Sequence, residues 1–325
     1  MARPGRHAGA RPGLLDHQLV FVTGKGGVGK TTVAAALAQL SAEQGRRTLI
    51  CEVEPRGDVA DAFQAEPTNY LPREVQPGLW AMSMDTEAAL RQYLSLNLPV
   101  PPAARLGPLA RVFDFVATAA PGVREILVIG KLCFEVREGN YDLVVVDAPA
   151  TGHIVGQLAA PASVNELVKT GLIREQTGWM QEILADPART GLVIVATPEE
   201  MPVTETVDLA GRVARETPVD LAAVAVNRVL PELFSRREEE IYHAVASPKR
   251  ASAWGEAAIG DLQPILSAAD LAVTMRRTAA VHLARLREAI NPEVPLLYLP
   301  YLFGRAGGLR ATRQLAAALS GELGY

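Results

Sequence analysis

Cysteine is scarce in this sequence. The 325 residues include two cysteines, Cys51 and Cys133, and no Cys-x-x-Cys pair. A disulfide framework needs several cysteines at short spacings, and a structural zinc site needs about four clustered thiolate or imidazole ligands. Neither is supported here. We therefore predict two buried, unreactive thiols and a reducing, cytoplasmic setting.

Long apolar runs and excess positive charge are also missing. No apolar run approaches the roughly 20 residues that cross a bilayer, so we expect membrane contact to be indirect at most. The formal net charge of −4 argues against a nucleic-acid partner, because no basic surface would offset phosphate repulsion. Residues 1–16 are rich in Arg, Pro and Gly without the apolar core of a secretory signal. They predict a disordered basic tail or a start site placed too early.

The chain does contain apolar segments of strand and helix character in alternation. Residues 33–40 predict a helix, and the strandless region from about 84 to 139 predicts a helical insertion with helices at 87–94, 109–118 and 123–134. We predict a single α/β domain over residues 17–325, built on a doubly wound, mostly parallel sheet. Its predicted strands are apolar runs at 18–22, 47–53, 142–147, 191–196, 222–227 and 294–299.

A phosphate-binding loop joins the first predicted strand to the first helix. Gly24, Gly29, Lys30 and Thr31 have the spacing G-x-x-x-x-G-K-T. Glycines allow the backbone to approach phosphate, the lysine reaches the β and γ phosphates, and the threonine hydroxyl suits Mg²⁺. We predict ATP and Mg²⁺ as cofactors, a sheet of the P-loop NTPase type, and nucleotide contacts from Gly26, Gly27, Val28, Gly29, Lys30, Thr31 and Thr32.

A second lysine, Lys25, follows the first glycine of this loop and has no required partner inside it. The run G-K-G-G-V-G-K-T-T resembles the deviant Walker A loop of the class that includes MinD and ParA, the nitrogenase iron protein, and the arsenical-pump and tail-anchored-protein targeting ATPases. The resemblance implies that Lys25 is catalytic and acts on the nucleotide of a second subunit, like an arginine finger supplied in trans. It also implies a homodimer or a closely related heterodimer.

Asp147 closes the most apolar predicted strand, which suits a carboxylate that holds Mg²⁺. The segment D-A-P-A-T-G-H at 147–153 resembles the D-T-A-P-T-G-H switch II of the arsenical-pump and targeting ATPases, with Pro149 one position early. We predict Thr31, Asp147 and Glu54 as metal ligands. His153 is interpreted as a structural or switch residue.

The acidic segment after the second predicted strand resembles switch I of the same family. By this match Glu54 stands where the family has the aspartate that orients the attacking water, and Gly57 and Asp58 replace the usual His and Asn. We predict Glu54 as the catalytic carboxylate, with Glu52 and Asp58 as competitors. Because glutamate is one methylene longer than aspartate, hydrolysis could be slower or differently gated.

Three later segments extend the resemblance. Asn227, at the end of a strand, matches the asparagine that reads adenine, and Pro300 matches the proline loop that packs on the base. Glu205 stands where the family's dimers make contacts between subunits. The chain is thus identified as a member of the arsenical-pump and tail-anchored-protein targeting ATPases, of a bacterial type without the Cys-x-x-Cys zinc clasp.

The leading hypothesis is a Mg²⁺-dependent ATPase that switches as a dimer and handles a membrane-protein or other hydrophobic client. The leucines and phenylalanines of residues 84–139 could line a groove for that client or could pack on each other and on the sheet. One alternative is a positioning scaffold similar to MinD or ParA, which requires a basic amphipathic terminal helix. Another is the energising subunit of an anion pump.

Overall fold

The computed structural model describes residues 12–97, 122–168, 170–232, 234–245, 263–303 and 307–325. Its centre is an eight-stranded sheet in the order β3-β4-β2-β5-β1-β6-β7-β8, in which β3 and β4 pair antiparallel and all other neighbours are parallel. This confirms the predicted α/β fold. The strands are β1 (Leu19–Gly24), β2 (Thr48–Glu52), β3 (Arg73–Gln76), β4 (Leu79–Ser83), β5 (Leu143–Asp147), β6 (Thr190–Ala196), β7 (Asp220–Val229) and β8 (Leu296–Pro300).

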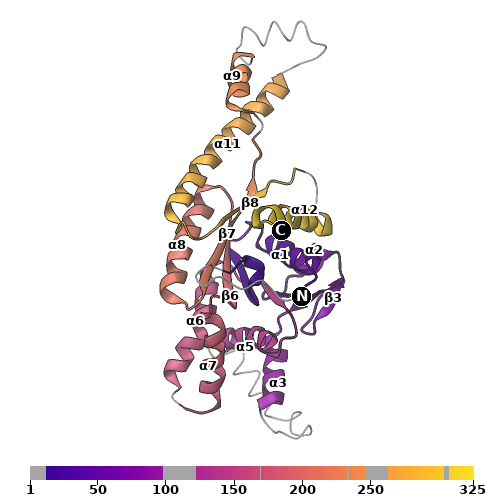
Figure 1. Cartoon of the computed structure of the whole chain (residues 1–325), viewed down its shortest axis with the longest axis vertical. Helices are drawn as coiled ribbons and strands as arrows, with labels where there is room; N and C mark the ends of the chain where they lie inside the picture. The colour runs from indigo at the N-terminus through magenta and orange to yellow at the C-terminus, as the bar shows by residue number, and fades with distance from the viewer. Residues whose placement is uncertain (1–11, 98–121, 169, 233, 246–262, 304–306) are drawn as a thin grey trace.

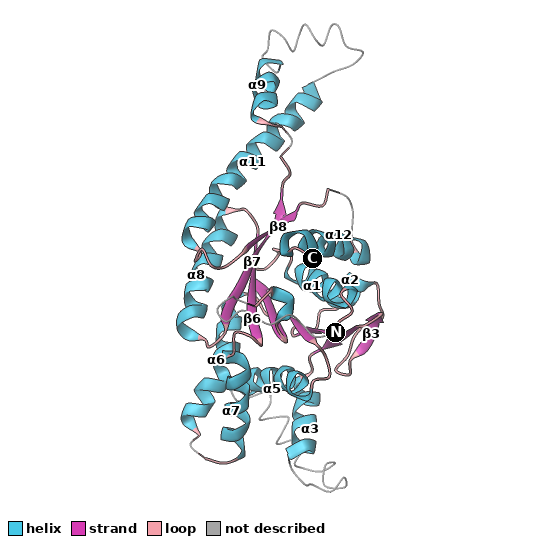
Figure 2. Ribbon diagram, in the orientation of Figure 1, coloured by secondary structure: helices cyan, strands magenta, loops and turns pink. Residues whose placement is uncertain are grey.

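Helices cover both faces of the sheet (Figure 1, Figure 2). The described helices are α1 (Lys30–Glu43), α2 (Asp58–Phe63), α3 (Thr86–Asn97), α5 (Val123–Glu138), α6 (Thr151–Leu167), α7 (Leu172–Ala185), α8 (Glu200–Glu216), α9 (Arg236–Val245), α11 (Gln263–Ala289) and α12 (Gly308–Leu323). Helices α1, α2 and α12 pack on one face, whereas α5 to α8 pack on the other. None of them has the length and apolar character needed to cross a membrane.

The central strands are apolar on both sides because each face lies under a helical layer. Strand β1 shows the division: Leu19 and Phe21 belong to the core under α5 to α8, and Val20 and Val22 to the core under α1 and α12. All four side chains are fully buried. A continuous apolar run is therefore the sequence that such a strand requires.

The helical insertion is present where it was predicted, with α3 and α5 within residues 84–139. The helix predicted at 109–118 lies outside the described residues. Two further helices, α6 and α7, lie beside α5 and extend the helical layer beyond the end of the sheet (Figure 1). At the opposite end of the molecule, α9 and α11 project away from the sheet (Figure 1).

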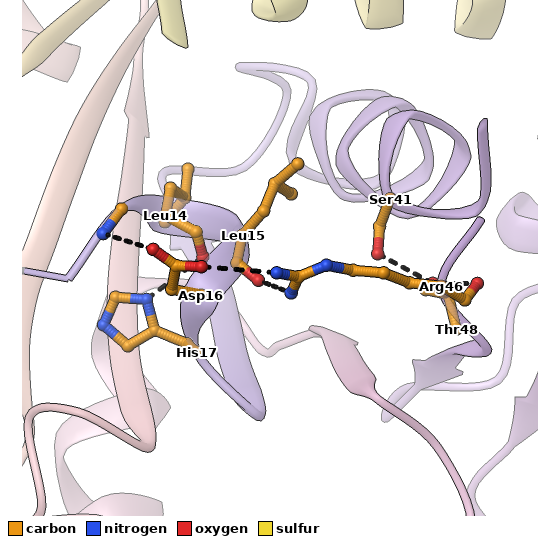
Figure 3. Close-up of polar contacts among 8 residues, drawn as sticks. Leu14, Leu15, Asp16, His17, Ser41, Arg46 and Thr48 are labelled. Atoms are coloured by element: carbon orange, nitrogen blue, oxygen red, sulfur yellow. Dashed lines mark hydrogen bonds and ion pairs between the residues drawn. The ribbon is translucent and has the colours of Figure 1, made fainter. Parts of the chain in front are cut away.

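The folded domain begins earlier than the predicted boundary at residue 17. Leu14 and Leu15 form a short 3₁₀ helix, Leu14–Asp16, and both side chains are buried in the core under α1. Figure 3 shows Arg46 reaching this segment, where its guanidinium donates to the Leu15 carbonyl and lies 3.3 Å from Asp16 Oδ1. The part of the predicted tail that the structure describes is therefore packed and hydrogen-bonded, because its two leucines bury apolar surface.

Candidate functional site

The phosphate loop occupies the turn between β1 and α1, and two of its glycines cannot be replaced without a clash. Gly24 has φ +153°, and a Cβ atom there would lie 2.2 Å from the carbonyl oxygen of Val195. Gly29 has φ +92°, and its Cβ would lie 2.5 Å from Asn227 Nδ2. The motif glycines are therefore required by close backbone approach as well as by positive φ.

A cavity of about 620 Å³ opens beside this loop. It lies at the carboxyl ends of the parallel strands, where open α/β sheets bind ligands. The loop and the start of α1 form one wall, α2 and α12 form another, and the segments after β7 and β8 close it. Its lining includes the predicted nucleotide contacts Gly26, Gly27, Gly29, Lys30, Thr31, Thr32, Asn227 and Pro300. Val28, the remaining predicted contact, is buried within the loop.

Thr31 and Asp147 meet at the base of the loop. The Thr31 hydroxyl donates to Asp147 Oδ2 at 2.7 Å, while Asp147 Oδ1 is buried and has no hydrogen-bond partner. Burial raises the pKa of Asp147 to about 6, against the lowering effects of the Thr31 hydrogen bond and the nearby Lys30 ammonium. A buried carboxylate oxygen without a partner, next to a hydroxyl, is a fitting donor set for a hard divalent cation.

These donors fit Mg²⁺ better than a metal that needs an all-protein cage. Within the described ranges no group of three or more His, Cys, Asp or Glu side chains could hold an ion. Mg²⁺ is commonly held by one or two protein oxygens together with water and substrate phosphates. Thr31 and Asp147 are the residues that would hold it here.

The three acidic candidates after β2 have different surroundings. Glu52 is 1% exposed, and its carboxylate accepts hydrogen bonds from the backbone N–H groups of Gly57 and Asp58 and from the Ser83 hydroxyl. It therefore anchors the loop and is not available to position water. Asp58 lines the cavity.

Glu54, predicted to position water and to bind metal, lies outside the cavity lining. Its side chain is 40% exposed, and its one ion pair within the described residues is with Arg56, at 2.9 Å. In the free chain Glu54 is thus turned to a neighbour in its own loop, and it makes no hydrogen bond there to Thr31 or Asp147. Both roles of Glu54 require the loop to rearrange.

Lys25 has a partner in its own chain. Its ammonium lies 2.6 Å from Glu205 Oε1 on α8, and the Thr151 hydroxyl at the start of α6 is 3.4 Å from Glu205 Oε2. Glu205 therefore links the phosphate loop to the segment that resembles switch II. The 180 residues between Lys25 and Glu205 hide this pairing from sequence reasoning, which identified both residues without connecting them.

The residues predicted to meet the base, Asn227 and Pro300, line the same cavity. The Asn227 amide donates from Nδ2 to the Val28 carbonyl at 2.9 Å and accepts from the backbone N–H of Arg228 at 2.9 Å. Asn227 thus supports the phosphate loop in the free chain. Pro300 and Tyr301 line the cavity beside it and offer an apolar surface to a planar ring.

A second cavity, of about 440 Å³, lies in the helical layer, and none of its lining residues belongs to the phosphate loop. Its walls come from α3, α5, α6 and α7, and they are apolar except for a few groups. One of these is Lys131, whose ammonium pairs with Glu135 at 2.6 Å and lies 4.9 Å from the centre of the Tyr70 ring. Both charged side chains are buried, and each has a second partner outside α5: Lys131 donates to Gln92 Oε1 at 3.1 Å, and Glu135 accepts from Asn140 at 2.7 Å.

Comparison with known proteins gives consistent matches. A model of the anion-transporting ATPase family matches residues 17–178 and 172–244. The ATPase BagA of Mycobacterium tuberculosis is 34% identical over 240 residues, which cover 70% of this chain and 68% of that protein. A putative arsenical pump-driving ATPase of Halobacterium salinarum is 29% identical over 234 residues, 67% of this chain and 36% of that protein. An ATPase ASNA1 homolog of Cryptosporidium parvum is 26% identical over 245 residues, 65% of each chain.

Proposed function

Because this chain belongs to the anion-transporting ATPase family and is an ATPase, we propose that it is a Mg²⁺-dependent, nucleotide-switched dimer that handles a hydrophobic client. Hydrolysis of ATP follows from the family, whereas the metal, the dimer and the client are our proposals. Each rests on a different part of the structure.

The observation that carries the metal proposal is the Thr31–Asp147 pair. The orphaned Oδ1 of Asp147 is a buried acceptor beside the phosphate loop, and a bound cation would satisfy it. Mg²⁺ bound there would neutralise charge on the β and γ phosphates. Lys30 and the backbone N–H groups of the loop hold the phosphates, and α1 contributes the positive end of its dipole.

The dimer proposal rests on Lys25. Its side chain is 31% exposed, its ammonium is held by Glu205, and it lies outside the lining of its own nucleotide cavity. A cation in this position is suited to reach the nucleotide of a second subunit, in a homodimer or a closely related heterodimer. To do so, the Lys25 ammonium must leave Glu205. Because Glu205 also contacts Thr151, this exchange would change the surroundings of the loop after β5.

The client proposal rests on the cavity in the helical layer. Its volume lies within the range of about 300 to 1,000 Å³ that is usual for ligand pockets, and its walls are apolar. An apolar helix of a client protein buries its side chains in such a groove. Phe134, Ile126 and Trp179 are among the side chains that would contact it.

Two observations bear on the alternatives. In α12 the leucines face the core, with Leu315 and Leu319 buried against α1, so this helix is not free to serve as a membrane anchor. The names of several relatives point to arsenical pumps. A thiolate site for arsenite would need accessible sulfurs, and both Cys51 and Cys133 are fully buried.

The catalytic proposal is tested by two lysine variants. Lys30→Ala should abolish binding of a fluorescent ATP analogue, because it removes the ammonium that meets the phosphates. Lys25→Ala should bind the analogue within about twofold of the wild type and hydrolyse ATP at least about a hundredfold more slowly, as expected when a cation supplied in trans is lost. Wild-type hydrolysis per subunit should rise with protein concentration. Normal hydrolysis by Lys25→Ala would rule out the trans role.

The client proposal needs a separate test. In a Glu54→Gln chain loaded with MgATP to slow turnover, a photo-crosslinking residue at Phe134 should capture an apolar protein segment from a cell extract. The same residue at Val281, which is 68% exposed on α11 and outside the lining of this cavity, is the matched control. Equal capture at both positions would contradict a client groove.

A further inference from the structure

The loop between β2 and α2 carries an arginine that the phosphate-loop chemistry does not yet use. Arg56 lines the nucleotide cavity, and its side chain is 70% exposed. Its one polar partner among the described residues is Glu54, in the same loop. A guanidinium that faces an ATP site and is held only by a water-exposed carboxylate is weakly restrained, because solvent screens such pairs.

The base of this loop is fixed, whereas its tip is not. The buried Glu52 carboxylate accepts the N–H groups of Gly57 and Asp58, so the start of α2 is tied to the end of β2. Gly57 has φ +87°, a conformation that allows a sharp turn directly after Arg56. Residues 54–56 therefore form a short arch between two anchored points, and their side chains can change partners without unfolding the loop.

The arch stands at the phosphate end of the cavity. Strand β2 lies next to β5, with Glu52 opposite Asp147, and the backbone N–H of Val53 donates to the Asp147 carbonyl at 3.2 Å. Arg56 follows three residues later. The other arginine of the cavity, Arg228, lies near the end of β7, and its backbone N–H donates to Asn227, the residue predicted to meet the base. Of the two, Arg56 is the one whose loop begins at the end of β2, beside Asp147.

We propose that Arg56 is a catalytic residue that acts in its own subunit, and that it exchanges Glu54 for the terminal phosphate of ATP. The proposal rests on the proposed ATPase site. A planar guanidinium donates two parallel hydrogen bonds to phosphate oxygens, and such charge-assisted bonds are stronger than a solvent-screened ion pair. The exchange also frees the Glu54 carboxylate, which then faces the space where the attacking water would lie.

The reaction is ordinary hydrolysis. The water oxygen forms a bond to the terminal phosphorus while the bond from that phosphorus to the β–γ bridging oxygen breaks, which yields ADP and inorganic phosphate. The proton lost by water passes through Glu54 to the solvent. Negative charge develops on the phosphate oxygens and on the leaving oxygen, and Arg56 contributes a positive charge in addition to that of Lys30.

The test separates catalysis from binding. Arg56→Ala, Arg56→Lys and the control Arg212→Ala would be compared for kcat and KM with MgATP and for affinity to MgADP, which lacks the terminal phosphate. Arg212 is the control because it is also an arginine paired with a carboxylate on its own element, Glu216, and it lies outside the cavity lining. Neither arginine is buried, so all three changes should leave the fold intact.

We expect Arg56→Ala to lower kcat at least about tenfold and to leave the MgADP dissociation constant within about twofold. Arg56→Lys should fall between wild type and Arg56→Ala, because lysine keeps the charge and loses the planar fork. Arg212→Ala should match the wild type. Wild-type kcat in Arg56→Ala, or an equal loss of MgADP affinity, would overturn the role of Arg56. Failure of the wild-type chain to bind or hydrolyse MgATP would instead overturn the proposed function.

Discussion

The isolated carboxylate of Asp147 should make the metal-free protein lose stability as the pH rises. Asp147 is 8% exposed, and burial raises its pKa from the ordinary 3.8 to about 6; the Thr31 hydrogen bond and Lys30 lower it, and the acidic neighbours Glu52 and Asp58 raise it. The folded chain therefore binds the proton more tightly than the unfolded chain. Stability is highest below the unfolded pKa and is lost as the pH rises through the folded pKa.

The size of the effect follows from the shift. Each pKa unit corresponds to about 1.4 kcal/mol, so a shift of about two units corresponds to about 3 kcal/mol over the whole range. Part of this stability is already lost below pH 5, because the unfolded chain ionises there. About 1.4 kcal/mol is still to be lost between pH 5 and pH 8. Asp147→Asn cannot ionise and should lack this component. The stability of the variant relative to the wild type should thus increase by about 1.4 kcal/mol from pH 5 to pH 8.

Urea unfolding monitored by tryptophan fluorescence measures this difference. Both proteins would be unfolded in EDTA at pH 5 and pH 8, and the change in the difference between them isolates Asp147 from every other titrating group. It also removes any constant cost of the new amide, whose N–H₂ would be a buried donor. A difference that does not change with pH would refute the desolvation of Asp147. At pH 8, MgADP should stabilise the wild type and not the variant, because the carboxylate is then neutralised by a cation.

Two further predictions concern the frame of the site. Gly24→Ala should destabilise the protein by about 3 kcal/mol in the same urea assay, because its Cβ would meet the Val195 carbonyl oxygen at 2.2 Å; Gly26→Ala, where a Cβ meets nothing within 4 Å, should be nearly neutral, and equal effects would contradict the clash. Burial raises the pKa of the Cys51 thiol and raises that of Cys133 to about 12. Neither thiol should therefore react with a disulfide reagent at pH 8 until the chain is unfolded, and rapid native reaction would show that one of them is accessible.

The central strands and the loop between them could be predicted from the sequence because they depend on short-range patterns. A continuous apolar run in the sequence predicts a strand that is buried on both faces of the sheet. Val144, Val145 and Val146 in β5 are an example. The phosphate loop is likewise local, since its glycines and Lys30 lie within seven residues. Parallel strands then bring the ends of β1, β2 and β5 to one edge, which explains why the predicted residues meet there.

Other features depended on signals that were weaker or not local. The antiparallel β3 and β4 were not predicted; the Pro-Gly pair between them, Pro77-Gly78, is a turn signal that could have located their hairpin. The predicted disordered tail, residues 1–16, was too long. Its Arg and Pro residues suggested disorder, and the two leucines at 14 and 15 were not recognised as core residues. The position of the Glu54 side chain depends on the backbone conformation of its loop, which a match between sequence motifs does not give.

Two cations of the proposed mechanism are each paired with a carboxylate in the free chain, and this has a consequence for the proposed switch. Lys25 is held by Glu205, and Arg56 is held by Glu54. A bound nucleotide with its phosphates can compete for both cations, yet each exchange also frees a carboxylate that must find new surroundings. Glu54 is released within its own loop, and Glu205 keeps its contact with Thr151. The proposed exchanges would therefore couple the terminal phosphate to the loop that orients water and to the contact between subunits, through ion pairs that are individually weak and easily reversed.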